Sequence, residues 1–191
     1  MTKVIAISGS PATSSRTQAV LGYTLNVLSQ NGIETALIRV RDLPAEDLLY
    51  GRYNSAAILA ANEQVAQAQG VIIATPVYKA AYTGVLKSYL DLLPQTGLAG
   101  KVVLPIATGG TLAHLLSIDY SLKPLISALG SRQVLQGVYV VDKQVRLSDQ
   151  GEFELDGDVL ERLDQALAEL RQALSLADNV AHAPSLVVSG V

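Results

Sequence analysis

Five short runs of apolar, largely β-branched residues recur along the chain at intervals of about 30 residues. They cover residues 3–8, 34–40, 70–75, 101–108 and 133–141. Continuous apolar runs of this length are typical of parallel strands that are buried on both faces of a sheet. The pattern therefore predicts a parallel sheet of five strands.

The stretches between these runs carry apolar residues at helical spacing, as at Leu86, Leu90 and Leu93. Helices are predicted over residues 15–30, 55–68, 83–93 and 156–177. Strands that alternate with helices in this way form stacked βαβ units. The predicted fold is α/β and flavodoxin-like: a five-stranded parallel sheet in the order 2-1-3-4-5, with helices on both faces.

The last quarter of the chain departs from this alternation. Residues 142–155 include the turn-forming stretch SDQGE and predict a turn or a small hairpin before the last helix. Residues 178–191, with Gly, Pro and small residues, are expected to form a tail. With 191 residues, 49% of them hydrophobic, the chain suits one flavodoxin-like domain over residues 1–177.

Composition excludes several kinds of function. The net charge is −3 and the basic residues do not cluster, so no nucleic-acid partner is expected. The absence of Cys removes disulfides, thiolate metal sites and any Cys nucleophile, and two His leave little material for a metal site. No leader segment and no apolar run of about 18 residues is visible, so the expected location is cytoplasmic, with no membrane partner.

Three loops of unusual composition follow strands 1, 3 and 4. They read SGSPATSSRT (8–17), TPVYKAAYTG (75–84) and TGGTLAH (108–114). In the order 2-1-3-4-5 these three strands are neighbours, and ligands of such folds bind beyond their carboxyl ends. The three loops are therefore expected to meet at one site.

The first loop predicts a site for an anion. Six of its ten residues carry a hydroxyl and none is acidic. It leads from a strand into a helix, where free backbone N–H groups and the helix dipole favour a phosphate. The candidate phosphate ligands are Ser10, Ser14, Ser15, Arg16 and Thr17. In the alternative interpretation Ser14 or Ser15 only caps the helix, which explains one hydroxyl of the six.

The second loop offers backbone donors and flat side chains. Pro76 stiffens the exit from strand 3, and the N–H groups of residues 77–80 are expected to be free to face a ligand. Tyr78 and Tyr82 present planar, amphipathic surfaces. The alternative is a simple turn with two half-exposed tyrosines.

The third loop places Gly109 and Gly110 where strand 4 turns into a helix. Glycine at such a position permits a positive φ or the close approach of a ligand ring. His114 either contacts the ligand or is packed and caps the helix. The three loops together contain no acid, base or nucleophile that we assign to catalysis. They fit a phosphorylated planar cofactor with its own chemistry, a description that FMN satisfies.

The three loops lie in the stretches ISGSP and SSRT, TPVYKAAYTGVLKSYLDLLP, and GKVVLPIATGGTLAHLLSIDYSLKP. With these stretches the chain resembles the NADPH-dependent FMN reductase family over residues 1–175. They are most similar to its alkanesulfonate-system (SsuE-type) members. The resemblance implies hydride transfer from NADPH to FMN, and release of reduced FMN to a partner monooxygenase that liberates sulfite from alkanesulfonates. It implies that the phosphate contacts Ser10, Ser15, Arg16 and Thr17, and that the ring is bordered by Pro76, Val77, Tyr78, Lys79, Thr108, Gly109, Gly110 and Thr111. The chain departs from many relatives at Ala12, where they carry Arg.

The helix after the third loop is expected to be irregular. One apolar stripe, expected to face the core, comprises Leu115, Ile118, Leu122, Leu125 and Leu129; an opposite stripe comprises Ala113, Leu116, Tyr120 and Pro124. Because the sheet covers only one stripe, a second subunit is expected to cover the other. Pro124 lacks the N–H that the Tyr120 carbonyl would accept, so a kink or a π-bulge is predicted near residues 117–123.

The resemblance implies that this irregularity is a π-helix around Tyr120 at the interface of a homotetramer, in enzymes that release FMN rather than retain it. The alternative is a proline kink beside a packed Tyr. Two other functions remain open: a flavodoxin-like electron carrier, and a quinone or azo reductase that retains FMN. By charge alone, Arg16, Arg52 and Lys79 are candidates for binding the 2′-phosphate of NADPH.

Overall fold

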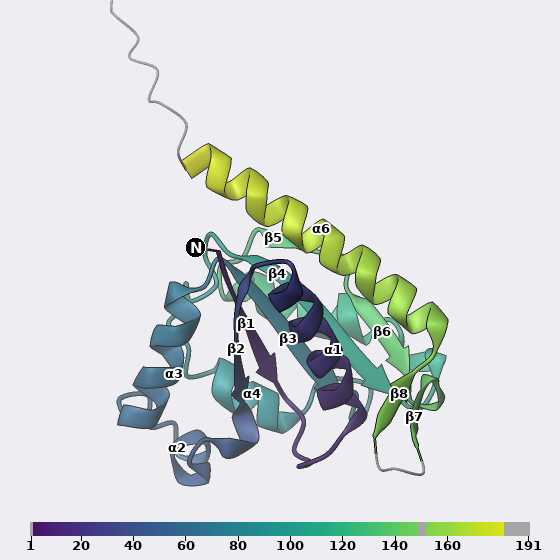
Figure 1. Ribbon diagram of the computed structural model, residues 1–191. Coiled ribbons are helices and arrows are strands. Elements are labelled where there is room, and N and C mark those ends of the chain that lie inside the picture. Colours follow the sequence, from purple (N-terminus) through teal and green to yellow (C-terminus); the bar gives the residue numbers. More distant parts are fainter. Residues whose placement is uncertain (1, 149–151, 182–191) are drawn as a thin grey trace, which may run out of the picture.

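The computed structural model describes residues 2–148 and 152–181. Its main sheet consists of β1 (Lys3–Ser8), β2 (Glu34–Arg39), β3 (Gly70–Pro76), β4 (Val102–Gly109), β5 (Gln133–Val134) and β6 (Val138–Val141). All pairings in this sheet are parallel and the order is β2-β1-β3-β4-β5, with β6 also paired to β4 (Figure 1). The predicted flavodoxin-like order 2-1-3-4-5 is confirmed.

The fifth strand of this order is split into β5 and β6 by residues 135–137. Gly137 has a φ of 89° and packs against β4, where an added Cβ would lie 2.7 Å from the Pro105 carbonyl oxygen. The Leu135 N–H still donates to the Val103 carbonyl at 2.9 Å. The continuous strand predicted over residues 133–141 is therefore interrupted where only glycine fits.

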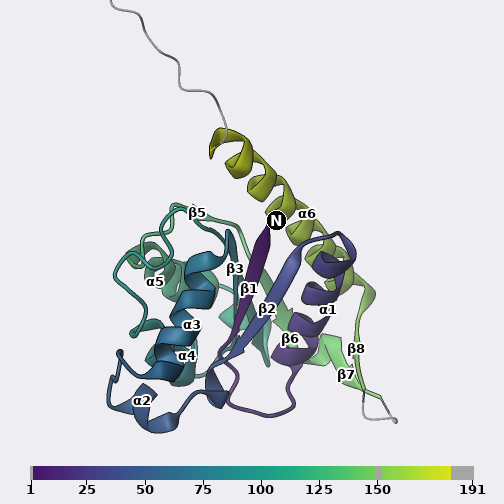
Figure 2. The ribbon, with the colours of Figure 1, turned by 60° about the vertical axis from the view of Figure 1, so that its left-hand side comes forward.

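Helices cover both faces of the sheet (Figures 1 and 2). One face carries α1 (Arg16–Gln30) and α6 (Gly157–Ala181); the other carries α3 (Ala56–Gln67), α4 (Gly84–Leu90) and α5 (Lys123–Ala128). Alternate residues of β1 serve the two cores, since Val4 packs with α1 and α6 and Ile5 packs with α3 and α4. This layering explains why the strand sequences are apolar throughout.

Shorter elements complete the chain. After β2 come a turn of 3₁₀-helix, η1 (Val40–Asp42), and α2 (Ala45–Leu49). The small hairpin predicted within 142–155 is present as η4 (Asp142–Gln144) and the antiparallel pair β7 (Val145–Leu147) and β8 (Phe153–Leu155).

The last helix reaches into the segment that was expected to be a tail. α6 continues past residue 178 to Ala181, and residues 182–191 of the expected tail lie outside the described residues. No helix within 2–148 and 152–181 is long and apolar enough to cross a membrane.

The segment between β4 and α5 contains the predicted irregularity. A 3₁₀ turn, η2 (Leu112–His114), precedes a π-helix, η3 (Ile118–Leu122), and Pro124 lies in the first turn of α5. The Lys123 N–H donates to the Ile118 carbonyl, five residues back, which is the hydrogen bond of a π-helix. The prediction of a π-bulge near 117–123 is confirmed.

The two apolar stripes of this segment differ in exposure. Ile118 and Leu122 are buried, but Leu115 is 45% exposed, so its placement in the core-facing stripe is wrong. The 3₁₀ turn and the π-helix shift the register between Leu115 and Ile118, which turns Leu115 outward. The opposite stripe is uncovered in the single chain, with Leu116 at 58% and Tyr120 at 79% exposure.

Candidate functional site

The three unusual loops lie together at the carboxyl ends of β1, β3 and β4. The hydroxyls of Thr17 and Thr108, from the first and third loops, are 2.7 Å apart and buried. The Val77 N–H, in the second loop, donates to the Thr108 carbonyl at 2.7 Å. The Thr83 hydroxyl, at the end of the second loop, donates to the Gly9 carbonyl at 2.6 Å. Hydrogen bonds thus join each loop to the other two, which is the arrangement expected from the strand order.

Besides Thr17, two further hydroxyls of the first loop already have partners within the protein. Ser15 is the N-cap of α1, and its Oγ accepts a hydrogen bond from the Gln18 N–H at 3.2 Å. Ser10 is buried, and its Oγ accepts from the Ala12 N–H at 3.3 Å. Ser15 therefore caps α1, which was one of the two positions considered for capping.

The remaining donors at this point suit an anion. α1 begins at Arg16, so the N–H groups of Arg16 and Thr17 have no acceptor within the helix. The Ser14 hydroxyl is exposed beside them, and the buried Ser8 hydroxyl at the end of β1 lacks a hydrogen-bond partner within the described residues. Free N–H groups, hydroxyls and a helix N-terminus are the donor set that a phosphate requires.

The Arg16 side chain extends from α1 towards the segment that follows β6. Its Nε donates to the Val145 carbonyl at 3.2 Å, and its Nη1 is 3.9 Å from Oδ2 of Asp142. The same carboxylate borders the third loop, since a Cβ added to Gly110 would lie 3.9 Å from Asp142 Oδ2. Asp142 thus places a carboxylate beside loops that contain no acidic residue, and the sequence interpretation missed it because it lies in the predicted hairpin.

The second loop is a tight turn with an uncommon backbone. Tyr78 and Ala81 exchange backbone hydrogen bonds of 2.9 and 3.2 Å, and the two residues between them have φ of 51° (Lys79) and 65° (Ala80). Two successive residues with positive φ are typical of a type I′ turn, in which Asn and Gly are preferred. A side chain in this left-handed region costs roughly 1–2 kcal/mol. Strain of this kind gathers at functional sites.

This turn also limits which donors of the second loop are free. The expectation of free N–H groups over residues 77–80 is wrong for Val77 and Tyr78, which donate within the protein. The N–H groups of Lys79 and Ala80, at the exposed tip, have no acceptor within the described part of the chain. Tyr78 is exposed, whereas the ring of Tyr82 is half-buried against the core.

The two glycines of the third loop have different neighbours. At Gly109 an added Cβ would lie 2.3 Å from the Tyr139 hydroxyl, which donates to the Thr111 carbonyl at 2.8 Å. Burial, with a smaller contribution from the Asp142 charge, raises the pKa of this hydroxyl, so it remains a donor. At Gly110 a Cβ would enter open space apart from Asp142.

Close packing therefore explains Gly109, and neither Gly109 nor Gly110 has the positive φ that was considered. Gly110 is where an approaching ligand would find room. His114, at the end of η2, is half-buried.

Sequence and structure comparisons identify the family to which these loops belong. The sequence model of the NADPH-dependent FMN reductase family matches residues 2–146. The chain belongs to this family. It is 46% identical to the "FMN reductase (NADPH)" of Escherichia coli K12, over 92% of each chain, and 42% identical to that of Pseudomonas putida, over 98% of this chain and 93% of the relative.

Among solved structures, the apo form of the NADH:FMN oxidoreductase EMOB superposes with a TM-score of 0.81 at 40% identity, over 91% of this chain and 90% of that one. The resemblance given by the three loops is thus confirmed. The chain is an oxidoreductase of a family that uses FMN and NADPH. The phosphate of FMN suits the hydrogen-bond donors of the first loop.

Two of the three candidate cations for the NADPH 2′-phosphate have carboxylate partners in this FMN reductase. Arg16 faces Asp142, and Arg52 lies within 3.4 Å of both Glu46 and Asp47, with its guanidinium 5.5 Å from the centre of the Tyr50 ring. Lys79 has no ion-pair partner within the described residues. Charge alone therefore leaves Lys79 as the candidate whose ammonium group is uncompensated.

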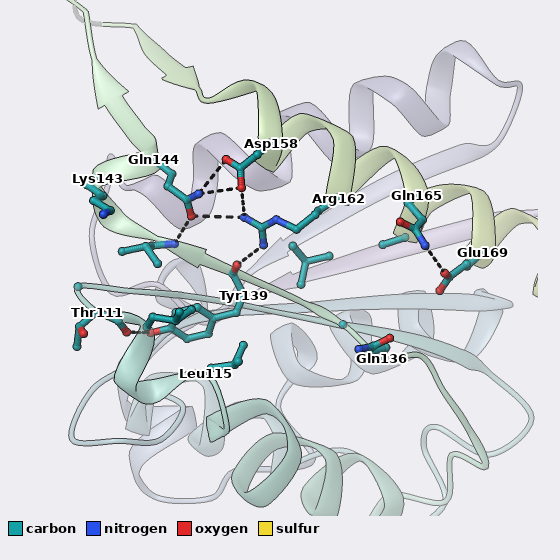
Figure 3. A pocket seen from close by; sticks show the side chains of 16 residues that line it. Thr111, Leu115, Gln136, Tyr139, Lys143, Gln144, Asp158, Arg162, Gln165 and Glu169 are labelled. Carbon is teal, nitrogen blue, oxygen red and sulfur yellow. Dashed lines mark hydrogen bonds and ion pairs between the residues drawn. The ribbon is translucent and has the colours of Figure 1, made fainter.

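A cavity of about 840 Å³ borders the third loop and runs along β6 to α6 (Figure 3). Arg162 and Gln144 occupy its wall at the edge of β6. The Arg162 guanidinium donates to the Tyr139 carbonyl at 2.7 Å, and the Gln144 amide oxygen accepts from the Val141 N–H at 3.0 Å. Asp158 accepts hydrogen bonds from both side chains. These contacts hold η4, and with it Asp142, against β6 and α6.

Proposed function

We propose that the chain reduces FMN with NADPH and that FMN acts as a released substrate. In this proposal the phosphate lies among Ser10, Ser14, Ser15, Arg16 and Thr17, and the ring lies between residues 76–79 and 108–111 with His114 nearby. The observation that carries the proposal is the buried hydrogen bond between Thr17 and Thr108, because it joins the phosphate loop to the ring loop. We assign this function to a domain of residues 1–177, followed by a tail.

The residues present at the site indicate what the protein itself contributes to the proposed reaction. Bound FMN supplies the hydride acceptor and NADPH the hydride, so the chain needs no acid, base or nucleophile. The N–H groups of Arg16 and Thr17 hold the phosphate at the start of α1. The N–H groups of Lys79 and Ala80 orient the ring from the tip of the second loop. Holding two rings face to face at the reacting distance is the main contribution to the rate.

The structural support for release and assembly lies in the π-helix. We assign Leu116, Tyr120 and Pro124, the exposed stripe of this segment, to the interface of a homotetramer. We propose that a monooxygenase of an alkanesulfonate system accepts the reduced FMN, and that the protein thereby serves sulfur acquisition. The support is the similarity of all three loops to those of alkanesulfonate-system reductases.

Steady-state oxidation of NADPH at increasing concentrations of added FMN tests the proposal. FMN as a substrate predicts a rate that rises with FMN and saturates. Oxidation that requires a quinone or an azo dye, with FMN retained on the purified protein, would instead indicate the second kind of reductase. The absence of NADPH oxidation under every condition would indicate an electron carrier. Sulfite release after addition of an alkanesulfonate monooxygenase then tests the partner.

A further inference from the structure

The Arg16 guanidinium already has partners within the protein when no phosphate is bound. As the first residue of α1, Arg16 lies beside the free N–H groups that suit an anion. Its guanidinium nevertheless extends to the segment after β6, with Nε 3.2 Å from the Val145 carbonyl oxygen and Nη1 3.9 Å from Asp142 Oδ2. The side chain is 47% exposed and that of Asp142 is 41% exposed, so the pair lies at the surface of the site.

The position of Asp142 is fixed by its neighbours. Gln144, two residues later, accepts from the Val141 N–H at 3.0 Å and donates to Asp158 at 2.9 Å (Figure 3). Arg162 joins the same group through the Tyr139 carbonyl and Asp158. The turn that carries Asp142 is therefore tied to β6 and α6, and the carboxylate is held between Arg16 and the open space at Gly110.

A carboxylate in this position opposes a phosphate in two ways. It competes for the Arg16 guanidinium, and its negative charge repels the phosphate dianion across the same site. We propose that Asp142 weakens the binding of the FMN phosphate by holding Arg16, and so keeps FMN an exchangeable substrate. This inference rests on the proposed function, and it gives Asp142 a specificity-determining role at the phosphate end of that site.

Equilibrium titration of FMN and of riboflavin, which lacks the phosphate, tests this role. Quenching of flavin fluorescence measures each Kd on flavin-free protein. In Asp142→Asn the FMN Kd is expected to fall about fivefold to tenfold, because one full charge near the phosphate is removed. The riboflavin Kd is expected to change less than about twofold, because riboflavin has no charge for Asp142 to repel. Asp142→Ser is expected to act in the same direction.

Two further variants locate the effect. Asp91→Asn removes a carboxylate of similar exposure, paired with Lys87 on α4, and is expected to leave both affinities unchanged. In an Arg16→Ala background, Asp142→Asn is expected to keep only the part of its gain that comes from the removed repulsion, because the competition for the guanidinium no longer exists.

The outcomes separate the inference from the function on which it rests. If the wild-type protein binds FMN and Asp142→Asn binds it no more tightly, the role of Asp142 is wrong and the proposed function stands. An equal gain for riboflavin, or a full gain without Arg16, also overturns that role. If neither protein binds FMN, the proposed function fails and the inference fails with it.

Discussion

At the scale of single residues, the tip of the second loop shows how the site is prepared. Lys79 and Ala80 both have positive φ although neither is Gly or Asn, and neither N–H group has an acceptor among the described residues. Neither Lys nor Ala is a residue type that indicates this conformation in a sequence. It is imposed by the flanking hydrogen bonds between Tyr78 and Ala81. The strain is therefore stored where the proposed ring would bind.

Replacing Ala80 with Gly is expected to stabilise the flavin-free protein. Glycine removes roughly 1–2 kcal/mol of left-handed strain from the folded protein. The greater conformational entropy of glycine in the unfolded chain offsets part of this gain. The expected net gain in the free energy of unfolding is about 0.5–1 kcal/mol, measured by urea denaturation. Ala81→Gly, next in the chain but without a positive φ, is expected to lower stability instead. A loss of stability in both variants would contradict this interpretation of the turn.

At the scale of elements, Pro124 explains why η3 departs from an α-helix. In a π-helix the Lys123 N–H donates to the Ile118 carbonyl, with one more residue between them than an α-helix has. Deletion of Tyr120 restores α-helical spacing between these two groups. A regular helix can pack differently against its neighbours, and we expect this to change how the adjoining third loop releases flavin.

Deletion of Tyr120 is therefore expected to yield a protein that retains FMN through purification and transfers reduced flavin more slowly; Tyr120→Ala is expected to shift both properties in the same direction. Flavin absorbance per chain and the rate of transfer measure the two effects. Tyr120→Phe, which keeps both the chain length and the ring, is expected to resemble the wild type. A colourless deletion variant with normal turnover would refute this role of the π-helix.

The sequence predicted those elements whose cause is local. Continuous apolar runs marked the strands, and a proline in an apolar helix marked the π-helix at 118–122. Contacts between distant segments were not predictable. The split at Gly137 depends on the backbone of β4, and the pairing of Arg16 with Asp142 depends on where the chain after β6 returns. The close packing of Tyr139 against Gly109 likewise depends on a distant segment.

At the scale of the whole molecule, the exposed apolar side chains around the π-helix support the proposed subunit interface. Leu112, Leu115, Leu116 and Tyr120 are all at least 45% exposed. Large exposed apolar side chains that gather in one segment are typical of subunit contacts. The position of these side chains directly after the third loop would place the proposed assembly and the proposed flavin exchange on the same segment.

Leu116→Glu is expected to dissociate the proposed tetramer into smaller species. Each copy loses the burial of one Leu, about 1.5–3 kcal/mol, and places a charge in an apolar contact. Light scattering after size-exclusion chromatography measures the mass. Leu59→Glu, at a leucine of similar exposure on α3, is expected to leave the mass unchanged. An unchanged mass for Leu116→Glu would place the interface elsewhere.

The convergence of the three loops on one flavin is tested most directly at Gly110. A Cβ there has only the Asp142 carboxylate within 4 Å, at an ordinary contact distance, so Gly110→Val is expected to fold with an unchanged Tm and to raise the FMN Kd at least about tenfold. Gly22→Val, also at an open position but on the surface of α1, is the matched control and is expected to bind FMN as the wild type does. Wild-type FMN affinity in a well-folded Gly110→Val protein would show that the ring does not lie among these loops.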